Sequence, residues 1–140
     1  MQVAQNITAE ARASALRSVL RELNASNNDI EASSCISSDG YSIASVLGQD
    51  VDPDRFAAMC ASLLALAYQA SQEIQRGNMK LVLIEGDQGV MLLVQAGADH
   101  ILAVAAKRGK NLGMIFLESK KVALKLVDVL KDIKPPTTIK

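Results

Sequence analysis

The fold of this chain is decided by residues 52–107, which read DPDRFAAMCASLLALAYQASQEIQRGNMKLVLIEGDQGVMLLVQAGADHILAVAAK. Asp52 followed by Pro53 is a typical helix start, and the apolar spacing after it predicts one long helix to about residue 76. Three apolar runs then follow, over 79–85, 90–96 and 101–107. Very short turns join these runs, which predicts a strand meander with little loop for an active site. The stretch therefore favours a binding module over an enzyme.

The expected middle helix has two unlike faces. Counted at about 100° per residue from Phe56, one face is large and apolar, and the opposite face is small and nearly uncharged, whereas exposed faces usually carry Glu, Lys and Arg. The inward set is Phe56, Met59, Cys60, Leu63, Ala67, Ala70 and Ile74. The outward set is Ala58, Ala61, Ser62, Ala65, Tyr68, Gln69 and Gln72. The pattern indicates a helix covered on both sides, and Gly77 is expected to end it as the C′ residue.

Shorter elements flank this stretch. Thr8 is expected to cap a first helix, which the polar residues 24–28 end. Alternation of apolar and polar residues predicts a hairpin over 30–46, and Asp39-Gly40 suits its turn because these residues tolerate positive φ.

A last helix completes the expected order α-β-β-α-β-β-β-α. Asn111 is expected to cap this helix and Pro135-Pro136 to end it. The sequence predicts a single domain over 1–140, with its core at about 8–131 and a polar tail at 132–140. The nearly continuous apolar runs at 80–84 and 90–94 predict a sheet covered on both faces.

Composition and charge limit the classes of binding partner that the sequence suggests. Lys plus Arg and Asp plus Glu are 15 each, so the net charge is zero and nothing indicates nucleic acid or an anionic membrane as a partner. Residues 107–140 hold nine Lys/Arg against three Asp/Glu, which we interpret as a solvated basic face rather than a docking patch. The chain is 49% hydrophobic but only 3% aromatic, and a core this rich in Ala favours close packing over a large cavity.

No catalytic, cofactor-binding or metal-binding residue is predicted. Cys35 and Cys60 lack a CxxC spacing, and we interpret them as core thiols in a reducing cytoplasm. His100 has no nucleophile and orienting acid arranged near it in the sequence. A GxxxxGK[ST] phosphate loop does not occur. The sequence also shows no signal peptide and no apolar run long enough to cross a bilayer.

Several of these features occur together in one known family. They are the Asp39-Gly40 hairpin, the Ala/Leu-rich helix over 56–74, and the ending ILAVAA at 101–106 followed by Lys110-Asn111-Leu112-Gly113-Met114. In this order they resemble the Roadblock/light-chain-7 domain of the stand-alone bacterial or archaeal type. The resemblance covers roughly residues 8–131, nearly the whole chain.

This resemblance implies an α+β fold: a profilin-like domain of three layers with a five-stranded antiparallel sheet in the order 2-1-5-4-3. The middle helix would cover one face, and the first and last helices the other. Family members usually dimerise by pairing their third strands, with the two middle helices side by side. Carried onto this chain, the dimer edge is Met79, Lys80, Leu81, Val82, Leu83 and Ile84. An apolar strand at a sheet edge needs a partner in any case, because its backbone groups are unpaired.

The resemblance also implies a function. In the family the paired middle helices form a platform for a small Ras-like GTPase, and members act as regulators, effectors or scaffolds of such GTPases, or as dynein subunits. The platform of this chain would be the outward set of its middle helix. The expectation is a non-enzymatic homodimeric adaptor in the cytoplasm that binds and regulates a small GTPase. Two alternatives stay open: a small-molecule-sensing domain, and a structural scaffold subunit of a larger complex.

Overall fold

The structure, a computed structural model, describes the backbone of residues 2–108 and 111–132 and the side chains of residues 9–108 and 111–131. Its elements are α1 (Gln2–Ser26), β1 (Ile30–Ser37), β2 (Ser42–Val46), α2 (Pro53–Glu73), β3 (Leu81–Gly86), β4 (Gly89–Ala96), β5 (His100–Lys107) and α3 (Leu112–Asp132). This order is the one that the sequence predicts. The predicted helix end at Pro135-Pro136 and the polar tail lie outside the described residues.

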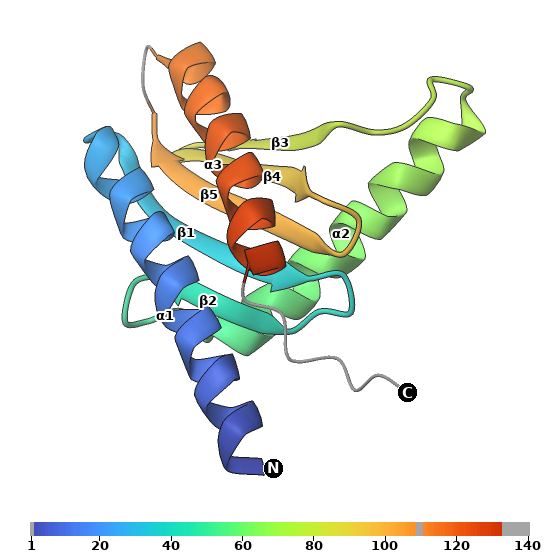
Figure 1. Ribbon diagram of the computed structural model, residues 1–140. Helices are drawn as coiled ribbons and strands as arrows, with labels where there is room; N and C mark the ends of the chain where they lie inside the picture. The colour runs from blue at the N-terminus through green and yellow to red at the C-terminus, as the bar shows by residue number, and fades with distance from the viewer. Residues whose placement is uncertain (1, 109–110, 133–140) are drawn as a thin grey trace.

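The five strands form one antiparallel sheet in the order β2-β1-β5-β4-β3, as predicted. Figure 1 shows the three layers: α1 and α3 lie side by side on one face of the sheet, and α2 lies on the other. The profilin-like α+β architecture is therefore confirmed. The edge strands are β2 and β3, and β3 begins directly after the loop that follows α2.

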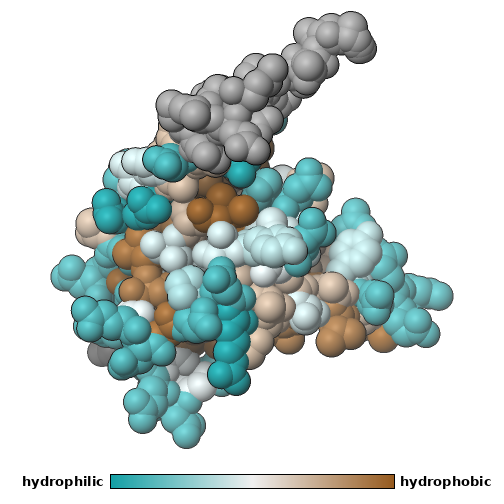
Figure 2. Space-filling model, turned by 90° about the horizontal axis from the view of Figure 1, so that it is seen from below, coloured by the Kyte–Doolittle hydropathy of each residue, from teal (hydrophilic) through white to brown (hydrophobic). Residues whose placement is uncertain are grey.

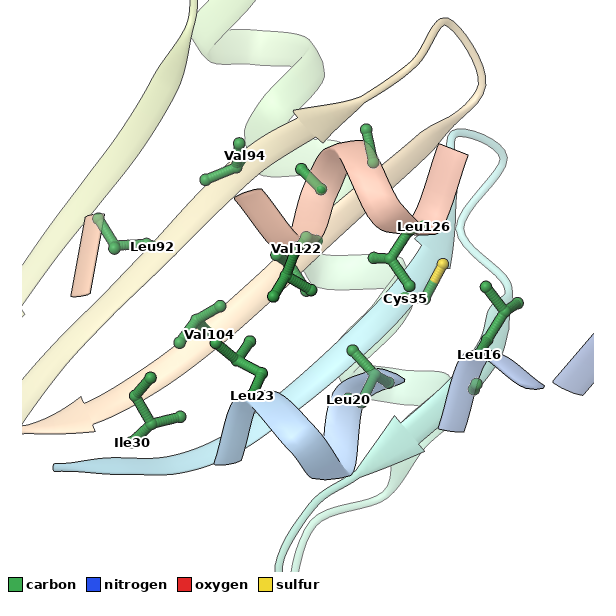
Figure 3. Packing of buried hydrophobic residues seen from close by; sticks show 14 of the residues in the cluster. Leu16, Leu20, Leu23, Ile30, Cys35, Leu92, Val94, Val104, Val122 and Leu126 are labelled. Atoms are coloured by element: carbon green, nitrogen blue, oxygen red, sulfur yellow. The ribbon is translucent and has the colours of Figure 1, made fainter. Parts of the chain in front are cut away.

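Each face of the sheet has its own apolar core. On the α1/α3 face, one cluster holds Leu16, Leu20 and Leu23 of α1, Leu126 of α3 and Leu102 of β5, all at most 1% exposed. Figure 3 shows the α1 leucines and Leu126 on the same side of the sheet. On the α2 face, a smaller core holds Ile36, Ala57, Cys60, Leu64, Leu93, Ile101 and Ala103. Successive residues of a strand point to opposite faces, so the continuous apolar run of β5 supplies both cores.

The start of α2 is confirmed and its end is corrected. The Asp52 carboxylate accepts hydrogen bonds from the backbone N–H groups of Asp54 (3.0 Å) and Arg55 (3.4 Å), as an N-cap does. The helix ends at Glu73, three residues earlier than the sequence suggested, and Gly77 is not its C′ residue. Gln75 occupies that position with a φ of 59°.

The hydrogen bonds after Glu73 explain this early end. The N–H of Gln75 donates to the carbonyl of Gln72 (3.0 Å), and the N–H of Arg76 donates to the carbonyl of Ser71 (2.9 Å). These two bonds define a Schellman motif, which satisfies carbonyls that the helix leaves free. A glutamine in the left-handed region is not predictable from residue preference, because that region favours glycine.

Two further predictions concern helix and hairpin ends. The prediction that Thr8 caps the first helix is wrong, because α1 begins at Gln2 and Thr8 lies within it. The Asp39-Gly40 turn is confirmed: Gly40 has a φ of 94°, and a Cβ at this position would lie 3.4 Å from the Cα of Ala58. The hairpin turn therefore rests closely against α2.

Candidate partner and dimer surface

The exposed edge of β3 is the first part of the candidate site. Within the described residues, β3 pairs with β4 on one side, and its other side has no strand partner. Leu83 and Ile84 are 45% and 39% exposed, although they are large and apolar. The strand begins at Leu81, so of the six predicted edge residues Met79 and Lys80 lie in the segment before it. An open apolar edge of this kind presents unpaired N–H and C=O groups to another strand.

The face that α2 turns to the sheet differs from the predicted one. Its buried residues are Ala57, Cys60 and Leu64, and neither Ala57 nor Leu64 was in the predicted inward set. Met59 is 54% exposed and Ile74 is 64% exposed, so placing them inward was wrong. Ala70 of the same set is also exposed, whereas Phe56, Leu63 and Ala67 are half-buried. The contact face is thus rotated by roughly 80°, which is less than one residue of the helix.

Residue size explains the rotation. The sequence-based prediction placed Phe56 and Met59 against the sheet because their side chains are large and apolar. The helix instead approaches the sheet through Ala57, which is 0% exposed, and Cys60, which is 1% exposed. Small side chains let a helix backbone come close, and the close approach of the Gly40 turn to Ala58 favours the same orientation.

This rotation leaves a row of large apolar residues facing outward on α2. Met59 and Leu66 are seven residues apart and therefore lie on one side of the helix, with Leu66 64% exposed. Ile74 extends the row at the end of the helix. Figure 2 shows apolar atoms among polar ones on the right-hand side of the view, toward which α2 extends in Figure 1. We call Met59, Leu66, Ile74, Leu83 and Ile84 the apolar seam.

The predicted platform residues occupy more than one side of α2. Ala58, Ser62, Ala65, Tyr68, Gln69 and Gln72 are exposed, whereas Ala61 is half-buried. By helical spacing, Ser62 lies beside Met59 and Leu66, whereas Ala58, Ala65 and Gln72 lie on one flank. Sequence reasoning placed Leu66 in neither set. Its seven-residue spacing from Met59 is the signal that could have found it.

Two platform residues also hold the loop after α2. The Tyr68 hydroxyl donates to Oδ1 of Asn78 (3.4 Å), and Nε2 of Gln72 donates to the same oxygen (3.2 Å) and to the carbonyl of Gly77 (3.2 Å). The Ser71 hydroxyl donates to that carbonyl as well (2.8 Å). These hydrogen bonds hold residues 77–78 against α2, so they stabilise the conformation of the α2–β3 loop.

Three titratable groups among the described residues have shifted pKa values. Burial raises the pKa of Cys35 to about 12 and that of Cys60 to about 11, so both thiols stay protonated at neutral pH. Burial and the nearby charge of Arg12 lower the pKa of His100, which Asp99 partly offsets. Among the described residues, no three His, Cys, Asp or Glu side chains lie close enough to hold a metal ion. No described helix is both long and apolar enough to span a membrane.

The sheet order, with two helices on one face and one on the other, defines a class: a profilin-like α+β domain. Fission yeast profilin has this fold, with a TM-score of 0.61 at 13% identity, covering 81% of this chain and 98% of that protein. The family model described as "Roadblock/LC7 domain" matches residues 11–106. The chain therefore belongs to the Roadblock/LC7 domain family.

Individual relatives agree with this assignment. The uncharacterized protein MJ1340 of Methanocaldococcus jannaschii is 36% identical over 108 residues, which cover 77% of this chain and 93% of the relative. Myxococcus xanthus MglB has a TM-score of 0.78 at 19% identity, covering 88% of this chain and 92% of that protein. A structure described as "MglB with tetrameric arrangement" has a TM-score of 0.77 at 17% identity, with 89% and 93% covered. At these identities the structural likeness establishes the fold.

Proposed function

We propose that this protein is a non-enzymatic adaptor that forms a homodimer and binds and regulates a small Ras-like GTPase. The observation that carries the proposal is the apolar seam, whose large residues are exposed on the open β3 edge and on the outward side of α2. Exposed large apolar residues at an open strand edge and on a helix of a small domain are typical of a protein–protein interface.

The dimer would use the seam. Pairing β3 with the β3 of a second copy would satisfy its free backbone groups and join the two sheets. Ile84 shares the α2 face with Val82, which packs against the α2 core. Met59 and Leu66 of one copy would then meet the same residues of its partner. An MglB structure described as a tetrameric arrangement supports self-association as a property of this fold family.

The GTPase would bind to the flank of α2 that the seam leaves free. This flank carries small and neutral residues, including Ala58, Ala65 and Gln72, and Tyr68 at its edge is 46% exposed. Aromatic anchors often carry much of the binding energy of an interface, and small neighbours allow close approach. Membership of the Roadblock/LC7 family supports a GTPase as the partner. The two unpaired cysteines support a reducing compartment such as the cytoplasm.

A titration tests the GTPase part of the proposal. A small Ras-like GTPase encoded in the same genome is loaded with a GTP analogue or with GDP and titrated calorimetrically with the protein. We expect saturable binding that depends on the nucleotide, and a change in the rate of GTP hydrolysis or nucleotide exchange. Absence of binding in both nucleotide states, for every such GTPase of the genome, would contradict the proposal.

A pair of variants locates the surface. Ala65→Arg should weaken GTPase binding at least about tenfold, because the arginine adds bulk and an unpaired charge to the contact. Ala25→Arg places the same side chain on the exposed surface of α1 and should leave affinity unchanged. If both variants bind like the wild type, the α2 flank is not the platform, and Lys120, Lys121 and Lys125 on the exposed side of α3 are tested next.

A further inference from the structure

The second half of α2 stands away from the sheet. Its last buried residue is Leu64, and none of residues 65–73 is buried. Figure 1 shows this half of the helix extending past the sheet toward the loop that leads into β3. A helix that diverges from the layer beneath it leaves space between the two.

That space is a cleft of about 710 Å³, a volume within the usual range for small-molecule sites. Leu64 of α2, Met79 before β3 and Ile101 of β5 supply its apolar surface. Three of its lining residues are small: Ala65 on the helix, and Gly97 and Ala98 in the turn between β4 and β5. The alanine content that suggested close packing is thus compatible with a cleft at this place.

Both walls of the cleft are fixed by hydrogen bonds. On one side, Asn78 is held by Tyr68 and Gln72, as described above. On the other side, Nε2 of Gln95 donates to the carbonyls of Gly97 (2.9 Å) and Ala98 (3.4 Å). The N–H of Ser38 also donates to the carbonyl of Asp99 (2.8 Å), which joins the two turns at this end of the sheet. A site with fixed walls loses little conformational entropy on binding.

The polar groups of the cleft are all uncharged. Among the residues that line it, the polar side chains are those of Ser38, Tyr68, Gln69, Asn78 and Gln95, and no Lys, Arg, Asp or Glu takes part. A charged ligand would lose hydration there without gaining a counter-charge, whereas a neutral one can exchange water for hydroxyl and amide partners. The lining therefore selects for a molecule without net charge.

We propose that this cleft between α2 and the β4–β5 turn binds a neutral small molecule with an apolar body and at least one hydrogen-bonding group. Asn78 of the α2–β3 loop and Ser38 of the β1–β2 turn are both part of its lining, and its volume suits a compact molecule. Because the ligand would contact both α2 and the sheet, it would fix the direction of the helix that carries the proposed platform. The site itself does not depend on the proposed GTPase function.

The neutral solvatochromic dye prodan, which has an apolar ring system and one carbonyl acceptor, is a suitable probe. We expect a saturable blue shift of its emission on titration, and amide shifts in ¹⁵N-labelled protein that centre on Ala65, Tyr68 and Ala98. Ala98→Trp should fill the cleft from the exposed turn and weaken binding at least about tenfold. Ala11→Trp adds the same ring to the exposed surface of α1 and should leave binding unchanged.

The proposal is overturned if prodan shows no saturable binding, or if Ala98→Trp binds it as tightly as Ala11→Trp. It is also overturned if the amide shifts centre on Met59 and Leu66, since the dye then binds the apolar seam. If Ala98→Trp also prevents formation of the dimer, the occupant of the cleft is a second copy of the chain, and the proposal is likewise overturned. Should Ala98→Trp fail to fold, Ala65→Phe fills the cleft from the opposite wall and takes its place.

Discussion

The two faces of the sheet are built from similar residues, yet they are closed to different degrees. On the α1/α3 face two helices cover the strands, and Leu16, Leu20 and Leu126 are 0% exposed. On the α2 face a single helix is buried through three small or medium residues, while Leu66 is 64% exposed. The first face therefore supplies most of the fully buried core, and the second leaves large apolar residues exposed, which fits the association proposed above.

The largest expected effect is on the closed face. Leu20→Ala should lower the free energy of unfolding by about 2–5 kcal/mol, because it removes a fully buried side chain and leaves a cavity. Leu124→Ala removes the same atoms from a residue that is 69% exposed and should change stability by less than about 0.5 kcal/mol. Urea unfolding monitored by circular dichroism measures both. Equal losses would mean that the α1/α3 face is not the stabilising core.

The next effect concerns the open face. Leu66→Arg should weaken the dimer about a hundredfold, because it places a charge within an apolar contact. Ala65→Arg, one residue earlier on a different side of α2, should leave the dimer intact and is the matched control. Sedimentation velocity across a dilution series measures both dissociation constants. If only Ala65→Arg dissociates the dimer, then the flank of α2 with Ala65 forms the dimer contact, and the side with Leu66 is the surface left for the GTPase.

A smaller effect is expected at the end of α2. Gln75→Gly should stabilise the protein by about 1 kcal/mol, because glycine adopts the left-handed conformation found there without strain. Gln69→Gly, within the same helix and equally exposed, should destabilise by about 1 kcal/mol. Thermal unfolding of the two variants should therefore shift in opposite directions. Shifts of the same sign would rule out the Schellman end.

The smallest expected effect is a pH dependence of the free energy of unfolding, caused by His100 on the α1/α3 face. The pKa of His100 is lowered on folding below its ordinary value of 6.5, so the unfolded chain binds more protons in that range. Stability should consequently fall as the pH drops through the range between the unfolded and folded pKa values. In His100→Gln this part of the pH dependence should be absent. Unfolding of both proteins between about pH 7 and pH 5 tests this, and identical slopes would contradict it.

The sequence was sufficient to predict the element order and the two-sided sheet. The apolar runs at 80–84 and 90–94 predicted cover on both faces; β4 confirms this with Leu92 and Leu93 in the two cores, whereas most of β3 is exposed. Asp52-Pro53 and Asp39-Gly40 mark their helix start and turn by local chemistry alone. The strand order came from the family resemblance, because local pattern does not determine which strands are neighbours.

What could not be predicted depends on tertiary contacts. The rotation of α2 follows from the close approach of Ala57 to the sheet, and a pattern based on residue size assigns that approach to Phe56 instead. The end of the helix depends on the left-handed conformation of Gln75 and on the Schellman hydrogen bonds that follow from it, which residue preference does not predict. The cleft arises where α2 diverges from the sheet, and neither the composition nor the spacing of its alanines encodes that divergence.

Light scattering coupled to size exclusion at micromolar concentration decides whether the open α2 face and the β3 edge form the proposed dimer interface. We expect a mass of twice the 14.9 kDa of one chain for the wild-type protein, and the mass of a single chain for Leu66→Arg with its circular dichroism spectrum unchanged. A wild-type protein with the mass of one chain would exclude the proposed dimer.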